Sequence, residues 1–242
     1  MGYITSICSG KDGVGKSTVA ALLGEAMAFS GSRVLLIEFE NGLRCLDRFL
    51  AANESTLFNI GDVMSGKCSS GDAVAVSPLS PNLSVIFAGF AREECRKKQF
   101  PELIAALSAR YDHILLDTDC SDESLKAVSA IAMNNLIIST QDPTGVRDAE
   151  YVCEKLFSYG APNLKVVFNR VNSAYIRKGF SADLDTCMDV VGAPLAGVIT
   201  EIPEIYDSVM NGRPLQKGSL PYTIFDNIRI RLEGGSAPLA VI

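Results

Sequence analysis

Two lysines and several glycines lie close together between Ser9 and Thr18, in the stretch SGKDGVGKST. The phosphate-loop pattern G-x-x-x-x-G-K-[ST] is satisfied by Gly10, Gly15, Lys16 and Ser17. Glycines let backbone N–H groups curl around a phosphate without Cβ clashes, and a helix that begins at the loop adds a partial positive charge. We therefore expect this stretch to bind the phosphates of a nucleotide.

Lys16 and Ser17 supply the charge and the hydroxyl that a bound nucleotide needs. Lys16 is expected to reach the β- and γ-phosphates, while the Ser17 hydroxyl would bind Mg²⁺. A glycine-rich turn without a ligand is the alternative, but an apolar run at 3–8 and a helix-like stretch at 17–30 flank the loop correctly. The predicted cofactors are ATP or ADP with Mg²⁺. The expected nucleotide contacts in the loop are Gly10, Lys11, Asp12, Gly13, Val14, Gly15, Lys16, Ser17 and Thr18.

Acidic residues follow two apolar runs farther along the chain. Glu38 and Glu40 stand at positions i and i+2 after the run 34–37, so both side chains point to one side of an extended segment. Asp117 ends the apolar run 114–116 in the manner of a Walker B carboxylate, which lies near the Mg²⁺ of phosphate-loop proteins. The spacing predicts one shared metal and water site, with Ser17, Glu38 and Asp117 as the expected metal ligands.

Short apolar runs alternate with helix-like stretches along the chain. Such runs are typical of strands buried on both faces, and the intervening segments are long enough for crossover helices. We therefore expect an α/β fold with a doubly wound, mostly parallel sheet, forming a single domain over residues 1–242, in which residues 221–242 are a peripheral tail. The predicted strands are 3–8, 34–37, 85–88, 114–116, 136–138, 166–168 and 196–199, and the predicted helices are 17–30, 101–109, 124–133, 146–159, 182–191 and 203–211.

The composition limits the classes of partner and location. The 242 residues are 48% hydrophobic and carry a net charge of −6, which disfavours binding to nucleic acid or to an anionic membrane surface. No apolar run approaches the roughly 18 residues of a membrane-spanning helix, and the N-terminus has no signal-peptide pattern. The 7 cysteines are scattered singly, which fits buried thiols in a reducing compartment. We expect a cytoplasmic protein.

Lys11 is a second lysine in the loop, at a position that the general pattern leaves open. A lysine there resembles the signature lysine of the MinD/ParA family of ATPases, whose loop is called a deviant Walker A motif. The resemblance extends over about residues 3–215 and implies that Lys11 reaches across a homodimer to the partner's nucleotide. Asp12 replaces a glycine of the family pattern, and we expect it to adopt a positive φ with its carboxylate pointing away from the phosphates.

The segment 37–47 resembles the first switch region of MinD-type members of the family, which have aspartates where this chain has Glu38 and Glu40. The resemblance implies that these acids orient the attacking water and support the magnesium shell. The extra methylene of each glutamate predicts slow hydrolysis. The second switch departs from the family, because the stretch 117–121 lacks the family's proline and glycine. The expected catalytic residues are Lys11, Lys16, Glu38 and Glu40.

Two later segments also match the family. The run 140–149 resembles a segment at the family's subunit interface, where Asp142 or Arg147 would take part. Asn169 and Arg170 resemble the adenine-reading position, since an asparagine amide offers both a donor and an acceptor. The loop that flanks the base in the family corresponds here to Glu201 and Ile202.

The resemblance implies a MinD-like ATP-hydrolysing switch that dimerises around two nucleotides and positions a regulatory protein partner in cell division, pilus or flagellum placement. The chain lacks the basic C-terminal helix of MinD-type members, so membrane association at the inner face of the cell membrane is expected to be weak or indirect. No specific nucleic acid is expected. Two alternatives stay open, a nucleotide-binding module with little hydrolysis and a ParA-like DNA partition ATPase. Turnover measurements and salt-dependent DNA affinity distinguish them.

Overall fold

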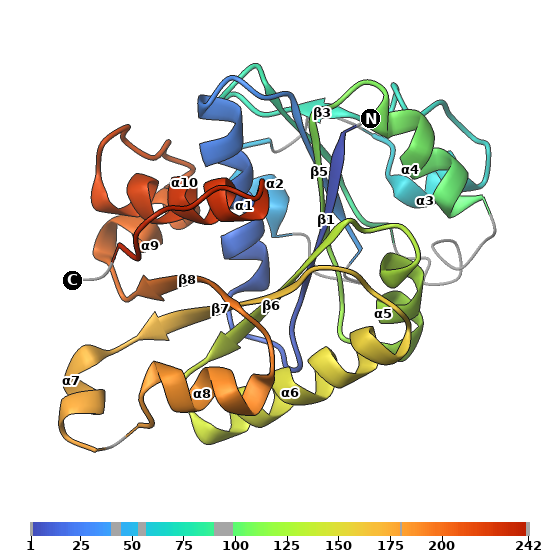
Figure 1. The fold of residues 1–242 in the computed structure, drawn as a ribbon. Helices are drawn as coiled ribbons and strands as arrows, with labels where there is room; N and C mark the ends of the chain where they lie inside the picture. Colours follow the sequence, from blue (N-terminus) through green and yellow to red (C-terminus); the bar gives the residue numbers. More distant parts are fainter. Residues whose placement is uncertain (1, 40–44, 53–56, 90–98, 180, 241–242) are drawn as a thin grey trace.

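The central feature of the structure is a twisted sheet of mostly parallel strands (Figure 1). The computed structural model describes residues 2–39, 45–52, 57–89, 99–179 and 181–240. Within these residues the strand order is β3-β4-β2-β5-β1-β6-β7-β8, and only the β3–β4 pair is antiparallel. The strands are β1 (Tyr3–Cys8), β2 (Val34–Glu38), β3 (Ala75–Val76), β4 (Leu83–Ile86), β5 (His113–Asp117), β6 (Asn134–Thr140), β7 (Leu164–Val171) and β8 (Leu195–Thr200).

The predicted doubly wound, mostly parallel sheet is confirmed. β2 and β5 are buried along their whole lengths, as expected for continuous apolar runs covered on both faces. β4 begins at Leu83, two residues before the predicted strand 85–88. β3 was not predicted, because Ala75–Val76 is too short to show a periodicity.

Helices cover both faces of the sheet (Figure 1). Side chains of α1, α2, α9 and α10 pack into one core cluster, and those of α3, α4, α5, α6 and α8 pack into the other. Among the described residues, no helix has the length and apolar character needed to cross a membrane. The helices are α1 (Lys16–Phe29), α2 (Leu46–Phe49), α3 (Ile60–Met64), α4 (Phe100–Ser108), α5 (Asp122–Ser129), α6 (Pro143–Ser158), α7 (Ser173–Arg177), α8 (Leu184–Val191), α9 (Pro203–Asn211) and α10 (Leu220–Leu232).

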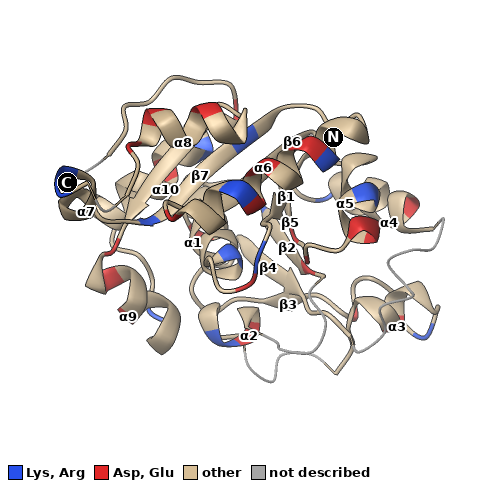
Figure 2. Cartoon of the chain, turned by 90° about the horizontal axis from the view of Figure 1, so that it is seen from below, with Lys and Arg blue, Asp and Glu red and all other residues tan. Residues whose placement is uncertain are grey.

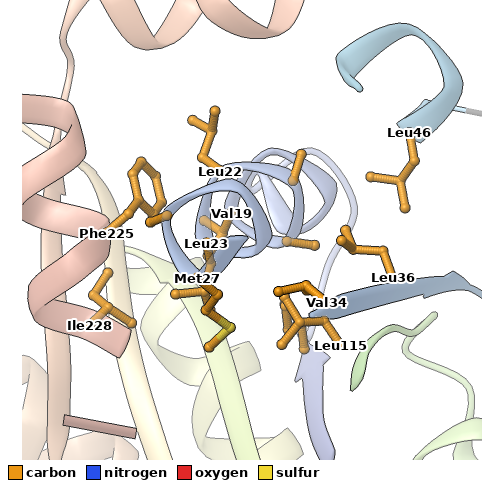
Figure 3. Close-up of a cluster of buried hydrophobic side chains, with 14 of the residues drawn as sticks. Val19, Leu22, Leu23, Met27, Val34, Leu36, Leu46, Leu115, Phe225 and Ile228 are labelled. Carbon is orange, nitrogen blue, oxygen red and sulfur yellow. The ribbon is translucent and has the colours of Figure 1, made fainter. Parts of the chain in front are cut away.

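The first helix, α1, is enclosed by the rest of the molecule. Val19, Leu23 and Met27 have 0% exposure. Figure 3 shows side chains of α10 on one side of α1 and side chains of β2 and β5 on another. A helix that is apolar around its circumference is stable only when it is buried in this way. The start of α1, and with it the loop before it, is therefore held by the core.

The expectation that residues 221–242 form a peripheral tail is wrong for the residues of α10. Phe225 and Ile228 have 0% exposure, and both belong to the core cluster around α1. The chain turns back only after this helix, at Gly234, whose φ of 87° lies in the left-handed region. The returning segment is fixed to α10 where Asn227 Nδ2 donates to the carbonyl oxygen of Pro238 over 3.0 Å. α10 is an integral part of the core.

Candidate nucleotide-binding site

The carboxyl ends of the parallel strands bring most of the predicted site residues together. The phosphate loop leaves β1, Glu38 ends β2 and Asp117 ends β5. Asp117 is paired in register with Ile7 of β1 and with Glu38 of β2. Figure 2 views the molecule from the side on which the loop between β1 and α1 lies, and basic and acidic residues are interspersed in that view. Ligands of open α/β sheets bind at this edge.

The bend of the phosphate loop depends on two glycines with left-handed backbone conformations. Gly13 has a φ of 78°, and Gly15, which precedes α1, has a φ of 96°. A Cβ at Gly15 would overlap the side-chain amide of Asn169, so only glycine fits there. Asp12 is exposed and does not have a positive φ, which corrects the expectation that it adopts the glycine conformation.

The N-terminus of α1 has the properties of an anion site. No side chain caps it, and no acidic residue occupies its first turn. The first N–H groups of a helix lack partners within the helix, and the helix dipole favours negative charge there. Lys16 is buried and Ser17 is partly exposed, and both lie in this first turn. The loop and the helix start therefore fit a phosphate group, as the sequence predicts.

Lys11 forms an ion pair within its own chain. Its Nζ lies 3.1 and 3.2 Å from the two carboxylate oxygens of Asp142, which caps the N-terminus of α6. Partial burial opposes ionisation of Asp142, but hydrogen bonds from Thr140 and the Gly145 N–H, together with Lys11, lower its pKa to about 2. The side chains of the pair are 32% and 48% exposed. Lys11 therefore has an ion-pair partner within its own subunit in this structure.

The acidic residues beside the loop differ in their surroundings. Glu38 is 1% exposed, and its carboxylate accepts hydrogen bonds from the backbone N–H of Cys45 at 3.1 Å and of Ala88 at 3.3 Å. Burial raises the pKa of Glu38, and these hydrogen bonds oppose the rise. Asp117 has 0% exposure at the end of β5. Glu40 lies outside the described residues.

The residues present fit a magnesium ion that accompanies a nucleotide. A hydroxyl in the first turn of α1, from Ser17, and a carboxylate at the end of β5, from Asp117, are oxygen donors of the kind that Mg²⁺ prefers. Among the described residues, no group of three or more His, Cys, Asp or Glu side chains forms a metal site of its own. A metal at this edge would therefore depend on phosphate oxygens for part of its shell.

A pocket of about 360 Å³ opens beside the phosphate loop. All four residues that were expected around the base lie in its lining, namely Asn169, Arg170, Glu201 and Ile202. Gly15 and Thr18, at the end of the phosphate loop and the start of α1, also line the pocket. The base of a nucleotide whose phosphates lie on the loop would therefore reach this pocket. One side of the pocket is formed by α9, through Ile205, Tyr206 and Val209, and these residues were not predicted. Their spacing after Ile202 is that of one helix face, which could have indicated that they line the same pocket.

Asn169 also contacts the phosphate loop directly, which the sequence did not indicate. Its Nδ2 donates a hydrogen bond of 2.7 Å to the carbonyl oxygen of Val14. Arg170 follows with a φ of 56°, at an irregularity in the pairing of β7 with β8. Arg147 is 75% exposed on α6, with Asp148 as its ion-pair partner at 3.6 Å. Asn169 therefore links the pocket to the loop, and the Lys11–Asp142 pair links the loop to the start of α6.

Known proteins resemble this chain over nearly its whole length. A family model described as the CobQ/CobB/MinD/ParA nucleotide binding domain matches residues 5–215. The septum site-determining protein MinD of Synechocystis sp. is 30% identical over 244 residues, which cover 98% of this chain and 92% of that protein.

Solved structures agree with this match. The MinC:MinD cell division protein complex of Aquifex aeolicus has a TM-score of 0.88 to this chain at 28% identity, with 98% of both chains covered. The septum site-determining protein MinD of Pyrococcus horikoshii, which was solved with Mg-ADP, shares the fold with a TM-score of 0.82 at 23% identity and 96% coverage of both chains. The resemblance predicted from the phosphate loop is confirmed. This chain belongs to the CobQ/CobB/MinD/ParA family of nucleotide-binding domains.

Proposed function

We propose that the protein binds ATP with Mg²⁺ at the phosphate loop, hydrolyses it slowly and works as a dimeric switch for a protein partner. The observation that carries the proposal is the uncapped N-terminus of α1 next to the pocket of about 360 Å³, where phosphates and a base would fit together. The MinD and ParA members of the family are phosphate-loop ATPases. The MinD protein of Pyrococcus horikoshii, solved with Mg-ADP, supports the choice of ligand.

In this proposal each part of the site has a separate task. Backbone N–H groups of residues 10–15 and the Lys16 ammonium hold the β- and γ-phosphates. Ser17 and Asp117 would hold Mg²⁺, which when bound neutralises charge on the phosphates. Glu38 and Glu40 would orient the attacking water, and Arg170, Glu201 and Ile202 would flank the base. Positioning dominates the catalysis of phosphoryl transfer, so hydrolysis depends on how the two glutamates are held.

ATP-dependent dimerisation is the second part of the proposal. For Lys11 to reach the nucleotide of a second subunit, it must first leave Asp142. The two side chains are partly exposed, and exposed ion pairs contribute only about 0 to 1 kcal/mol, so the exchange costs little. Phosphate oxygens of a bound nucleotide offer the ammonium a stronger partner than one carboxylate.

A regulatory protein is the proposed partner, and the complex of MinC with MinD from Aquifex aeolicus supports it. The net charge of −6 favours a MinD-like role over DNA partition. We propose a cytoplasmic location with weak or indirect membrane association. A nucleotide-binding module with little hydrolysis is the second candidate, because the Glu38 carboxylate is engaged by two backbone N–H groups.

The decisive experiment measures nucleotide binding, turnover and molar mass together. Calorimetry with Mg-ATP should show binding, a phosphate-release assay should show slow turnover, and light scattering with ATP should show a dimer. The Lys11→Ala variant should bind ATP as a monomer and lose the dimer. Lys67→Ala, which breaks an exposed Lys67–Asp62 ion pair of the same 3.1 Å length, is the matched control for the loss of a surface lysine. Turnover that is absent with and without a partner would favour the second candidate, and failure to bind ATP would refute both.

A further inference from the structure

Both the nitrogen and the oxygen of the Asn169 side-chain amide form hydrogen bonds within the protein. Nδ2 donates to the carbonyl oxygen of Val14 at 2.7 Å, and Oδ1 accepts from the backbone N–H of Arg170 at 2.9 Å. These partners fix which end of the amide is which, because a carbonyl only accepts and a backbone N–H only donates. Asn169 is 6% exposed. One N–H and one lone pair of the amide remain for a ligand.

The contact with Val14 determines the orientation of one peptide group in the phosphate loop. In a trans peptide, the carbonyl of Val14 and the N–H of Gly15 point in opposite directions. Because Asn169 holds the carbonyl on its own side, the Gly15 N–H faces the other way. Gly15 precedes Lys16, and backbone N–H groups at this point of a phosphate loop contact the phosphates.

The fit between the loop and Asn169 is close. Gly15 has a φ of 96°, and a Cβ built on it would overlap Asn169 Nδ2. Asn169 is held in turn by the sheet, since it pairs in register with Thr140 of β6 and Ile199 of β8. The left-handed residue Arg170 follows at a register shift, and such irregularities re-aim neighbouring side chains. β7, the neighbour of the edge strand β8, therefore contacts the loop through the side chain of Asn169.

We propose that Asn169 is a positioning residue that sets the phosphate-binding conformation of the loop and acts on phosphates more than on the base. This inference rests on the proposed nucleotide binding at the loop. It departs from the sequence-based expectation that Asn169 reads adenine with its full donor and acceptor pair. Recognition of the base then falls to the other residues of the pocket, including Thr200, whose buried Oγ1 has no hydrogen-bond partner in the structure.

A ligand without a base separates the two roles. Calorimetry would measure the affinities of the wild type and of Asn169→Ala for Mg-ATP and for magnesium tripolyphosphate. The expected result is a loss of about tenfold for both ligands, equivalent to about 1.4 kcal/mol. Tyr206→Ala is the matched control, because Tyr206 lines the pocket without belonging to the loop. It should weaken ATP binding and leave tripolyphosphate binding within twofold of the wild type.

The isosteric variant Asn169→Asp sharpens the test and guards against misfolding. A carboxylate oxygen would then face the Val14 carbonyl, so both affinities should fall further than in Asn169→Ala. Thermal melting without ligand confirms that each variant is folded. Loss of ATP binding with retained tripolyphosphate binding in both variants would overturn the inference and restore the base-reading role. If the wild type binds neither ligand, the proposed function itself fails.

Discussion

The phosphate loop and the acidic residues beside it lie at the same edge of the sheet, but they are built differently. The loop presents backbone groups, and its continuation α1 is enclosed by the core. Glu38 is a side chain at a strand end, and its carboxylate is engaged by the backbone of Cys45 and Ala88. The comparison indicates that the proposed phosphate site is preorganised, whereas the proposed catalysis would need side chains to exchange partners.

The largest expected effect comes from removing the support of α1. Phe225→Ala should lower the free energy of unfolding by about 3 to 5 kcal/mol, because a fully buried aromatic ring of α10 is lost from the core around α1. Denaturant unfolding measures the change. Phe157→Ala is the control, since Phe157 is 77% exposed on α6 and its removal should cost about 0.5 kcal/mol or less. Equal changes in the free energy of unfolding would contradict the idea that α10 stabilises the core around α1, and with it the start of α1 at the loop.

Removing the charge in the loop should come next in size. Lys16→Ala should weaken ATP binding about 100-fold, since hydrogen bonds to charged groups contribute up to about 3 kcal/mol. The free energy of unfolding without nucleotide should change much less. Calorimetry and denaturant unfolding on the same preparation check both statements. An affinity within threefold of the wild type would show that the backbone alone holds the phosphates.

The enclosed helix α1 also contains Glu25, which should make the free energy of unfolding depend on pH. Burial raises the pKa of Glu25 to about 7, although a hydrogen bond of 2.6 Å from the Leu215 N–H opposes the rise. The raised pKa means that the folded state binds the proton more tightly than the unfolded state. The associated stability is complete below the ordinary pKa and is lost as the pH rises through about 7.

Unfolding experiments from pH 5 to pH 8 test this pH dependence. Glu25 should account for a fall of about 2 to 3 kcal/mol in the free energy of unfolding over that range. Glu25→Gln cannot ionise and keeps an acceptor for Leu215, so this part of the pH dependence should disappear. If the free energy of unfolding of Glu25→Gln depends on pH in the same way as that of the wild type, a group other than Glu25 is responsible for the pH dependence.

The smallest expected effect concerns turnover. Glu38→Asp should raise the rate of ATP hydrolysis a few-fold, because the shorter side chain cannot reach both Cys45 and Ala88 and is freer to orient water. ATP affinity should stay within about twofold, since the loop is unchanged. Single-turnover kinetics and calorimetry give the two numbers. Slower hydrolysis would mean that the site is built around glutamate at this position.

Local patterns were enough to predict much of the candidate site. The glycines, Lys16 and Ser17 were found from one short stretch, and Asp117 was found as the acid that ends an apolar run. Short-range spacing failed where a contact joins distant segments. The Asn169–Val14 hydrogen bond spans 155 residues, and the Lys11–Asp142 pair spans 131 residues.

The sequence by itself determined the fold class and the expectation of a phosphate-binding loop, because apolar periodicity and a glycine-rich loop act through neighbouring residues. Only the tertiary structure decided that α10 belongs to the core, that Glu38 is engaged by backbone N–H groups and that Asn169 is hydrogen-bonded to the loop. These outcomes depend on which strands and helices become neighbours. That choice is made by the summed packing of the whole chain, to which each local pattern contributes only a part.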